Sequence, residues 1–174
     1  MTNCFHICIS ICLVVFQTTI MPFLPLFDQF YDLPVLLVIY LGLFRSAREG
    51  VPVTILTGLF MDAFSGAPFG LYTTTYIWLY ISIRWIISYL HGDNIFLLPV
   101  FVVFGVLMEN AIFLAAIILP DPGSQVSEIG LQSILTQVLW GLCTGPPLIV
   151  LLKGGYRKWD QWLKERSPEP NGLV

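Results

Sequence analysis

Charged residues are scarce in this chain. Only 11% of its 174 residues are Asp, Glu, Lys or Arg, whereas about a quarter of an average soluble domain is charged. Hydrophobic residues make up 56% of the sequence, which is more apolar surface than a soluble fold can bury. A helix that crosses a bilayer needs about 20 mainly apolar residues. The composition therefore predicts an all-α integral membrane protein with six transmembrane helices, and it argues against a soluble enzyme.

Cysteine is too rare and too poorly placed to indicate a metal centre or a disulfide framework. Cys4, Cys8 and Cys12 lie one helical turn apart in the first apolar run, and Cys143 lies in the last. No acidic or cysteine-rich loop accompanies them, so we interpret them as helix-packing residues and expect no cofactor. The first apolar run also lacks a basic n-region and a small-residue cleavage site, which favours an uncleaved first span over a secretory signal.

Catalytic motifs are missing from the sequence as well. An intramembrane aspartyl protease needs two aspartates as an acid and base pair, and the second acid here is a glutamate in another context. A serine protease needs a histidine near its serine, but His6 and His91 lie toward the predicted inner side, far from Ser65. The sequence contains no phosphate-binding loop and no large basic cluster. We therefore expect neither enzyme activity nor a nucleic-acid partner.

Six apolar runs separated by polar breaks predict six helical segments. Each break contains a charge or a turn former, where backbone polar groups can meet water. The second and third segments have 12 and 14 residues, which is short for a hydrocarbon core of about 30 Å. Two short spans are expected there, with a re-entrant hairpin as the alternative. The predicted segments cover residues 3–25, 33–44, 51–64, 69–89, 95–119 and 129–152.

Lys and Arg are missing from every second break. All eight fall on one side when the breaks are assigned alternately to the two sides of the membrane. The positive-inside rule makes that side the cytoplasm. The sequence therefore predicts that both ends of the chain are cytoplasmic (N-in/C-in). The acids assigned to the outer loops are Asp28, Asp32, Asp121 and Glu128.

The domain organisation that follows is simple. Residues 1–152 form one six-helix transmembrane domain, in which Pro146 and Pro147 predict a kink in the sixth helix. Residues 153–166 are basic and aromatic and are expected to form an interfacial helix at the cytoplasmic surface. Residues 167–174 are expected to be disordered.

Polar side chains within the predicted spans are candidate functional residues, because they are costly in a membrane. A rise of about 1.5 Å per residue places several of them in the outer half. They fit an outward-facing pocket or docking site, although such groups also hydrogen-bond to one another and hold bundles together. This predicted outer polar cluster comprises Gln17, Glu109, Asn110, Gln132 and Gln137, with Thr73, Thr74 and Thr75 as expected neighbours.

Asp62 lies near the outer end of the third segment, directly before the turn SGAPFG at 65–70. A negative charge is unfavourable at the carboxyl end of a helix, so we expect Asp62 to accept hydrogen bonds from the turn's backbone amides. In the sixth segment, the spacing of Gly141 and Gly145 predicts close helix packing. The most specific motif in the sequence comprises Gly58, Asp62, Ser65, Gly66, Gly70 and Leu71.

The region from Asp32 to Thr73, which contains this motif, is similar to the signature region of the bacterial rod shape-determining protein family MreD. The chain length, the six-segment layout and the short basic tail also resemble that family. The resemblance implies a non-enzymatic scaffold subunit of the cell-elongation (rod) complex, or elongasome. Such a subunit is a multi-pass protein of the bacterial inner membrane.

The resemblance also implies partners. An MreD-like subunit binds MreC, a single-span protein with a large periplasmic part. It thereby helps to maintain cell shape by linking MreB filaments to peptidoglycan and cell-wall synthesis by RodA and penicillin-binding protein 2. It would contact membrane lipids, and homo-oligomerisation is left open.

A second function class is suggested by the same layout. MreD-like chains resemble the S-components of vitamin transporters in size and in their six-helix arrangement, so an S-component-like bundle is expected. The alternative function is therefore a small-molecule-binding transporter subunit. Against it, the chain has few outward Trp, Tyr or Asn residues to bind a vitamin and no long outer loop to close over one.

Overall fold

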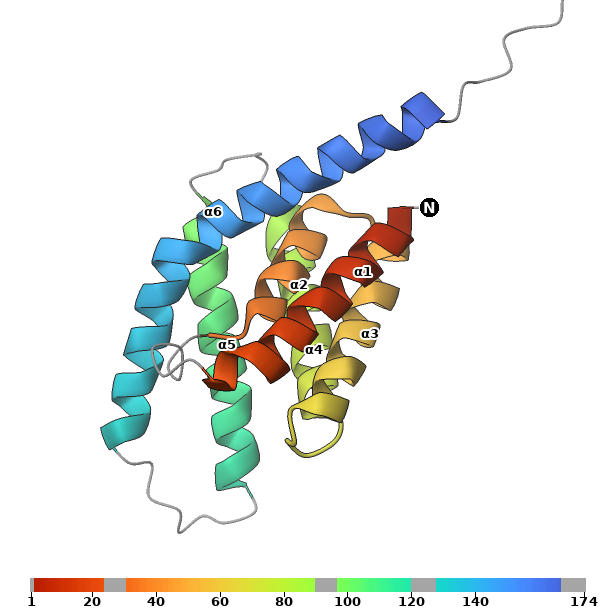
Figure 1. The fold of residues 1–174 in the computed structure, drawn as a ribbon. Helices are drawn as coiled ribbons and strands as arrows, with labels where there is room; N and C mark the ends of the chain where they lie inside the picture. The colour runs from red at the N-terminus through yellow and green to blue at the C-terminus, as the bar shows by residue number, and fades with distance from the viewer. Residues whose placement is uncertain (1, 24–30, 90–96, 120–127, 167–174) are drawn as a thin grey trace, which may run out of the picture.

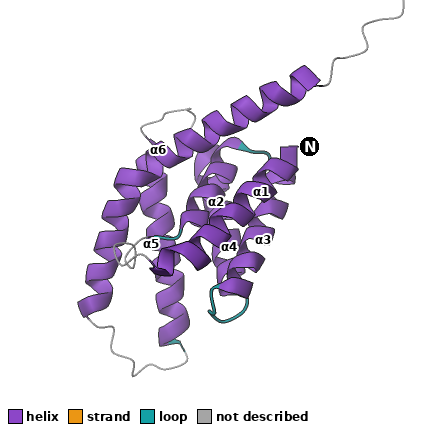
Figure 2. Ribbon diagram, in the orientation of Figure 1, coloured by secondary structure: helices purple, strands orange, loops and turns teal. Residues whose placement is uncertain are grey.

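The computed structural model describes residues 2–23, 31–89, 97–119 and 128–166. Within these residues all regular secondary structure is helical and no strand occurs (Figure 1, Figure 2), which confirms the predicted all-α class. A π-helical segment, η1 (Phe16–Ile20), and a 3-10 segment, η2 (Met21–Phe23), follow the first helix. The α-helices are α1 (Thr2–Val15), α2 (Leu33–Phe44), α3 (Ala47–Phe64), α4 (Leu71–Tyr89), α5 (Leu98–Ile118) and α6 (Glu128–Arg166).

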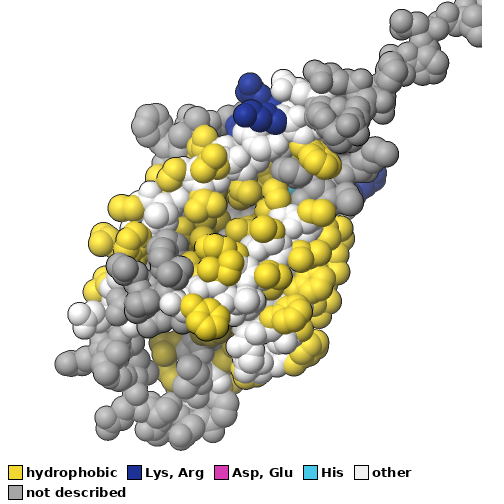
Figure 3. Space-filling view, viewed as in Figure 1, with side chains coloured by type: hydrophobic (Ala, Val, Ile, Leu, Met, Phe, Trp, Pro, Cys, Tyr) yellow, Lys and Arg dark blue, Asp and Glu magenta, His cyan; other side chains and the backbone are white. Residues whose placement is uncertain are grey.

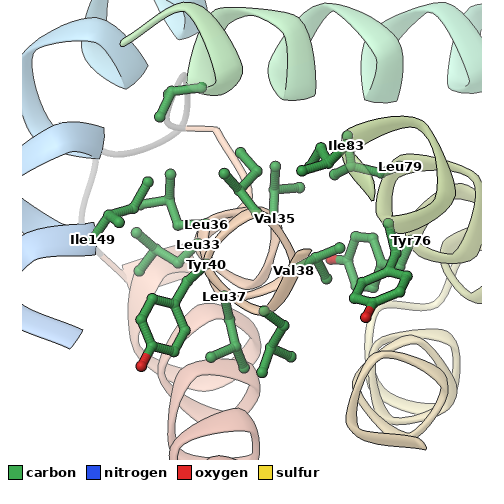
Figure 4. Packing of buried hydrophobic residues seen from close by; sticks show 14 of the residues in the cluster. Leu33, Val35, Leu36, Leu37, Val38, Tyr40, Tyr76, Leu79, Ile83 and Ile149 are labelled. Atoms are coloured by element: carbon green, nitrogen blue, oxygen red, sulfur yellow. The ribbon is translucent and has the colours of Figure 1, made fainter. Parts of the chain in front are cut away.

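Helix α2 forms the centre of the bundle and has the bounds that the sequence predicts. Every residue from Leu33 to Gly42 is buried, and α2 contacts each of the other five α-helices. Its side chains point toward Ile149 on one side and toward Tyr76 on another (Figure 4). A helix that is apolar all round is stable only when it is surrounded, so the other helices pack around this short segment.

Helix α3 begins before its predicted start and is not short. It runs over 18 residues, about 27 Å, rather than over 51–64 as expected. Pro52 lies inside the helix, and the turn before it is closed by the amides of Glu49 and Gly50, which donate to the carbonyl of Ser46. Charged residues marked this stretch as a break, but an exposed first helical turn also meets water, and Glu49 there complements the helix dipole.

The first apolar run is not one regular α-helix. The α-helix ends at Val15, and the π-helical turn η1 follows it directly. Within that turn, the hydroxyl of Thr18 donates to the carbonyl of Val14 at 2.8 Å, a side-chain bond that competes with the helical ladder. A π-turn contains one extra residue relative to an α-turn, so it changes the direction in which the following side chains point.

Helix α6 is a single helix of 39 residues. It combines the predicted sixth segment with the predicted interfacial segment 153–166, without a break between them. The helix changes direction along its length and extends past the end of the bundle (Figure 1). Two prolines inside it, Pro146 and Pro147, each remove a backbone donor and displace a carbonyl, which is the usual cause of a bend. Residues 167–174 lie outside the described residues.

Helix α6 approaches α5 closely at two glycines. A Cβ added at Gly145 would lie 2.7 Å from Cγ1 of Val102, and one added at Gly141 would lie 3.3 Å from the same atom. Real Cβ atoms essentially never come as close as the first distance. Both glycines therefore allow the α5–α6 contact, and Gly145 is the more tightly placed.

We expect the Gly145→Ala substitution to destabilise the protein by about 1–3 kcal/mol, because α6 must move away from Val102. The Gly141→Ala substitution serves as the matched control and should cost distinctly less, since its Cβ needs a shift of only a few tenths of an ångström. Thermal unfolding in detergent, followed by tryptophan fluorescence, measures both. Equal melting temperatures for the two variants would contradict this packing.

The surface is apolar over much of its area. Two stretches, Leu98–Ala116 and Gln132–Trp159, are long and apolar enough to cross a membrane, whereas His6–Ile20 and Leu33–Phe44 are apolar but shorter. Hydrophobic side chains are spread over the face seen in Figure 3, and the visible Lys and Arg side chains lie toward one end. Such extensive exposed apolar surface is typical of a protein that contacts lipid or a partner. These features agree with membrane association.

Candidate functional site

Asp62 connects the end of α3 to the start of α4. One carboxylate oxygen accepts a hydrogen bond from the amide of Tyr72 at 2.8 Å. The other accepts from the amide of Thr73 at 3.1 Å and from its hydroxyl at 2.6 Å. The first amides of a helix have no intrahelical partner, and a carboxylate there also complements the helix dipole. Asp62 therefore caps α4, which corrects our expectation that it binds the amides of the turn 65–70.

The turn between these helices depends on two glycines. Gly66 has φ of +73° and Gly70 has φ of +95°, conformations that glycine adopts without the steric cost of a Cβ. The hydroxyl of Ser65 accepts a hydrogen bond from the amide of Ala67 at 3.3 Å, and Leu71 begins α4. The reversal brings the amino end of α4 back over the last turn of α3, where it meets Asp62.

Gly58 brings α3 and α4 into backbone contact. A Cβ added at Gly58 would lie 2.5 Å from Cα of Thr73, so only glycine fits at this position. Asp62 follows one turn later, which places its carboxylate beside the same residue. We refer to this unit as the α3–α4 joint, and it contains Gly58, Asp62, Ser65, Gly66, Gly70, Leu71, Tyr72 and Thr73.

A polar cavity of about 180 Å³ lies next to this joint. It is formed where the start of α2 meets α4, α5 and α6, and Tyr72 belongs to both the cavity and the joint. Two carboxyl groups, two amides and two aromatic rings surround it. The lining residues are Asp32, Tyr72, Glu109, Asn110, Phe113 and Gln137.

Gln17 in η1 positions the first carboxyl group of the cavity. Its side-chain amide nitrogen donates to Oδ1 of Asp32, and its side-chain oxygen accepts from the amide of Leu33 at 2.8 Å. Asp32 in turn lies near Glu109 and Tyr72, with which it lines the cavity. The π-turn that contains Gln17 is therefore the element that fixes the start of α2 and its acid.

Glu109 and Asn110 contribute neighbouring polar groups from α5. The side-chain nitrogen of Asn110 donates to the carbonyl of Val106 and to Oε1 of Gln137, both at 2.8 Å. Glu109 is 6% exposed, and its Oε1 has no hydrogen-bond partner among the described residues. None of the six lining residues is basic. Among the described residues that line it, the cavity therefore has two acids and no lysine or arginine.

Four members of the predicted outer polar cluster lie in or beside the cavity, namely Gln17, Glu109, Asn110 and Gln137. The side chain of Gln132 is exposed and does not line it. The threonines expected as neighbours lie elsewhere: Thr73 binds Asp62, Thr74 is exposed, and the hydroxyl of Thr75 donates to the carbonyl of Leu71.

Sequence reasoning missed three lining residues: Asp32, Tyr72 and Phe113. Asp32 was assigned to an outer loop because of its charge. One signal in the sequence could have found Asp32. It directly precedes a helix that is apolar all round, and such a helix is buried in the bundle together with the residue before it.

A packed basic group, Arg45, lies at the opposite end of α2. The guanidinium of Arg45 lies 3.4 Å from the ring centroid of Tyr156, donates to the hydroxyl of Tyr40 at 3.4 Å and lies 4.0 Å from Glu49. The ring of His6 stacks on both tyrosines, with centroids 6.0 Å from Tyr40 and 5.3 Å from Tyr156. These contacts connect α1, α2 and α6 at the end of the bundle away from the cavity.

No protein-family model, curated protein or solved structure matches this chain. The similarity to MreD therefore rests on the motif residues and on the layout of the apolar segments. The motif residues are spread over 14 positions from Gly58 to Leu71 and all belong to the α3–α4 joint.

Proposed function

We propose that this chain is a non-enzymatic scaffold subunit of the MreD kind, which crosses a bacterial inner membrane six times with both ends in the cytoplasm. Its partner would be an MreC-like single-span protein, and through it the chain would act on MreB and on the cell-wall synthases. The observation that carries the proposal is the α3–α4 joint, because the residues most similar to MreD build one compact unit there.

The joint combines a fixed backbone with apolar side chains on its outside. Asp62 and Gly58 hold α3 against α4 through the contacts described above. Around them, Phe64 is 62% exposed and Phe69 is 76% exposed. Apolar side chains held on a rigid, closely packed helix pair suit the docking of a partner helix, because association within a membrane depends on close van der Waals packing.

The exposed apolar surface and the position of the basic residues support the membrane topology. At the end of the bundle opposite Asp62 lie Arg45, Arg48 and Arg84. Lys153 lies at the same end, where its ammonium group packs over the ring of Phe44, the residue before Arg45. This separation of charge along the bundle is what the positive-inside rule requires of a protein with its basic end in the cytoplasm.

The scaffold proposal is tested by replacing an exposed aromatic residue beside the joint. We expect Phe69→Ser to reduce co-purification of an MreC-like partner at least several-fold without lowering the melting temperature. Trp85→Ser is the matched control, because Trp85 is 66% exposed but lies near the other end of α4.

Depletion of the chain should convert rod-shaped cells to round ones. Equal complex yields for the two variants, or normal rods after complete depletion, would contradict the scaffold function.

The cavity favours a second candidate function, that of a small-molecule-binding, S-component-like transporter subunit. The space of about 180 Å³ is smaller than a typical ligand pocket of about 300–1,000 Å³, but its convergent polar groups and aromatic walls suit a small ligand. Native mass spectrometry of the purified protein should then detect a bound small molecule. A protein that carries none and binds none would count against this function while leaving the scaffold proposal intact.

A further inference from the structure

We propose that the cavity between the start of α2 and helices α4, α5 and α6 binds a small organic cation with a primary ammonium group. The inference deepens the second candidate function by naming a ligand class. It rests on the geometry of the cavity and is independent of the similarity to MreD.

The lining of the cavity suits a cation, because its six residues include two acids and no basic group. The carboxyl groups of Asp32 and Glu109 line the same cavity and lie close enough to interact electrostatically. Two carboxylates this close repel each other unless a proton or another positive charge lies between them. Arg45, the basic group at the other end of α2, is separated from Asp32 by the whole helix of 12 residues, about 18 Å. A bound cation would therefore supply the charge that the lining residues lack.

The hydrogen-bonding groups of the cavity call for a donor. Glu109 is 94% buried, and its Oε1 is a buried acceptor without a partner in the part of the chain that the structure describes. Asp32 already accepts one hydrogen bond, from Gln17, and carboxylate oxygens can accept more than one. An ammonium group has three N–H donors and no acceptor. It would satisfy Glu109 and bind Asp32 at the same time.

The size and the aromatic wall favour an organic cation over a bare metal ion. A volume of about 180 Å³ is far larger than one ion needs, and Ca²⁺ or Mg²⁺ requires six or more closely converging oxygen ligands. Among the described residues, no three His, Cys, Asp or Glu side chains form a metal-binding group. Tyr72 and Phe113 pack edge to face with ring centroids 4.9 Å apart, and aromatic rings attract ammonium groups as well as the carbon atoms attached to them.

The amides complete the recognition of such a ligand. Asn110 and Gln137 hydrogen-bond to each other and both line the cavity. They are held in place before a ligand arrives, since Asn110 is also bound to the backbone of its own helix. The ligand's polar tail would meet these amides, while its ammonium group meets the two acids.

A thermal-shift experiment on the full-length protein in detergent tests the inference. The probes are methylammonium, ethanolamine and putrescine as chlorides, and sodium chloride at equal ionic strength is the control. At least one ammonium probe should raise the melting temperature by about 5 °C when its concentration is about 100 times its Kd. No shift with any of the three, or an equal shift with sodium, would overturn the inference.

Two variants connect the response to the cavity. Glu109→Gln keeps the shape of the side chain but removes its charge. We expect this variant to need at least ten times more of the ammonium probe for the same rise in melting temperature. Glu49→Gln changes the acid beside Arg45 instead and should keep the full response. If Glu109→Gln does not fold, Phe113→Trp narrows the cavity without altering an acid and should weaken the response to a similar degree. An unchanged response in the folded variant would place the ligand elsewhere and overturn the proposal.

The outcome also distinguishes this inference from the second candidate function. Detection by mass spectrometry of a bound small molecule without an ammonium group would overturn the ammonium site but support a small-molecule binder. A specific ammonium response that is lost in Glu109→Gln supports both.

Discussion

Replacing Asp62 with leucine is expected to lower the melting temperature of the protein in detergent by roughly 10 °C. The carboxylate accepts three hydrogen bonds from Tyr72 and Thr73, and leucine can accept none. A hydrogen bond to a charged group contributes about 1.5–3 kcal/mol, so the loss of three should cost at least about 4.5 kcal/mol. For a chain of this size, 1 kcal/mol corresponds to about 2–4 °C.

Two comparisons separate this effect from a general loss of charge. Asp62→Asn keeps one acceptor oxygen and should lose about half as much stability. Glu49→Ala removes an acid whose only ion pair in the described part of the chain is a 4.0 Å contact with Arg45, and such surface pairs contribute little. Asp28→Ala, in a predicted outer loop outside the described residues, should likewise disturb complex assembly less than Asp62→Leu. Equal melting temperatures for Asp62→Leu and Glu49→Ala would show that Asp62 does not cap α4.

Replacing Gly58 with alanine should destabilise the protein by about 3 kcal/mol, because the new Cβ would meet backbone rather than a movable side chain. It would lie 2.5 Å from Cα of Thr73, so α3 and α4 would have to separate. Overpacking of this kind typically costs about 1–3 kcal/mol and occasionally more. The separation would also lengthen the hydrogen bonds of Asp62, which places the expected cost at the upper end.

Gly154→Ala is the matched control, and its expected effect has the opposite sign. Gly154 lies within α6, and a Cβ there would meet nothing within 4 Å. Alanine is favoured over glycine inside a helix by about 0.5–1 kcal/mol, so this variant should be slightly more stable. Thermal unfolding and partner co-purification should be measured on both variants. A shift of the same sign in both would mean that Gly58 is not a contact between helices.

The fold was predictable where the sequence changes abruptly. The apolar run of α2 lies between Asp32 and Arg45, and both of its ends were predicted correctly because charge and apolarity change at the same residues. The start of α3 was predicted wrongly, because Arg48 and Glu49 fit an exposed helical turn as well as a loop. The continuity of α6 past residue 152 was missed for a similar reason, since a helix that leaves the bundle no longer needs an apolar sequence.

The sequence predicted how deep along the bundle the site residues lie, but not which side of each helix faces the cavity. Counting the rise along each segment placed Glu109, Asn110 and Gln137 at a similar level, and they meet in the cavity. Gln132 lies at a nearby depth, but five residues correspond to a rotation of about 140° around the helix axis, so it cannot face the cavity together with Gln137. Which face of α4 carries an inward Tyr72 depends on how the helices are rotated against each other, and a single sequence does not fix that rotation.

The π-helical turn at Phe16–Ile20 acts as a shift of phase within the first helix. Before it, Ser10 is in register with α3, where its hydroxyl lies 2.6 Å from that of Thr57. Within it, Gln17 is in register with the start of α2. Deleting one residue here would restore a uniform helix and rotate these two contacts against each other by about 100°. The π-helical turn therefore lets the first helical segment contact α3 through Ser10 and the start of α2 through Gln17. The polar cavity depends on the second of these contacts.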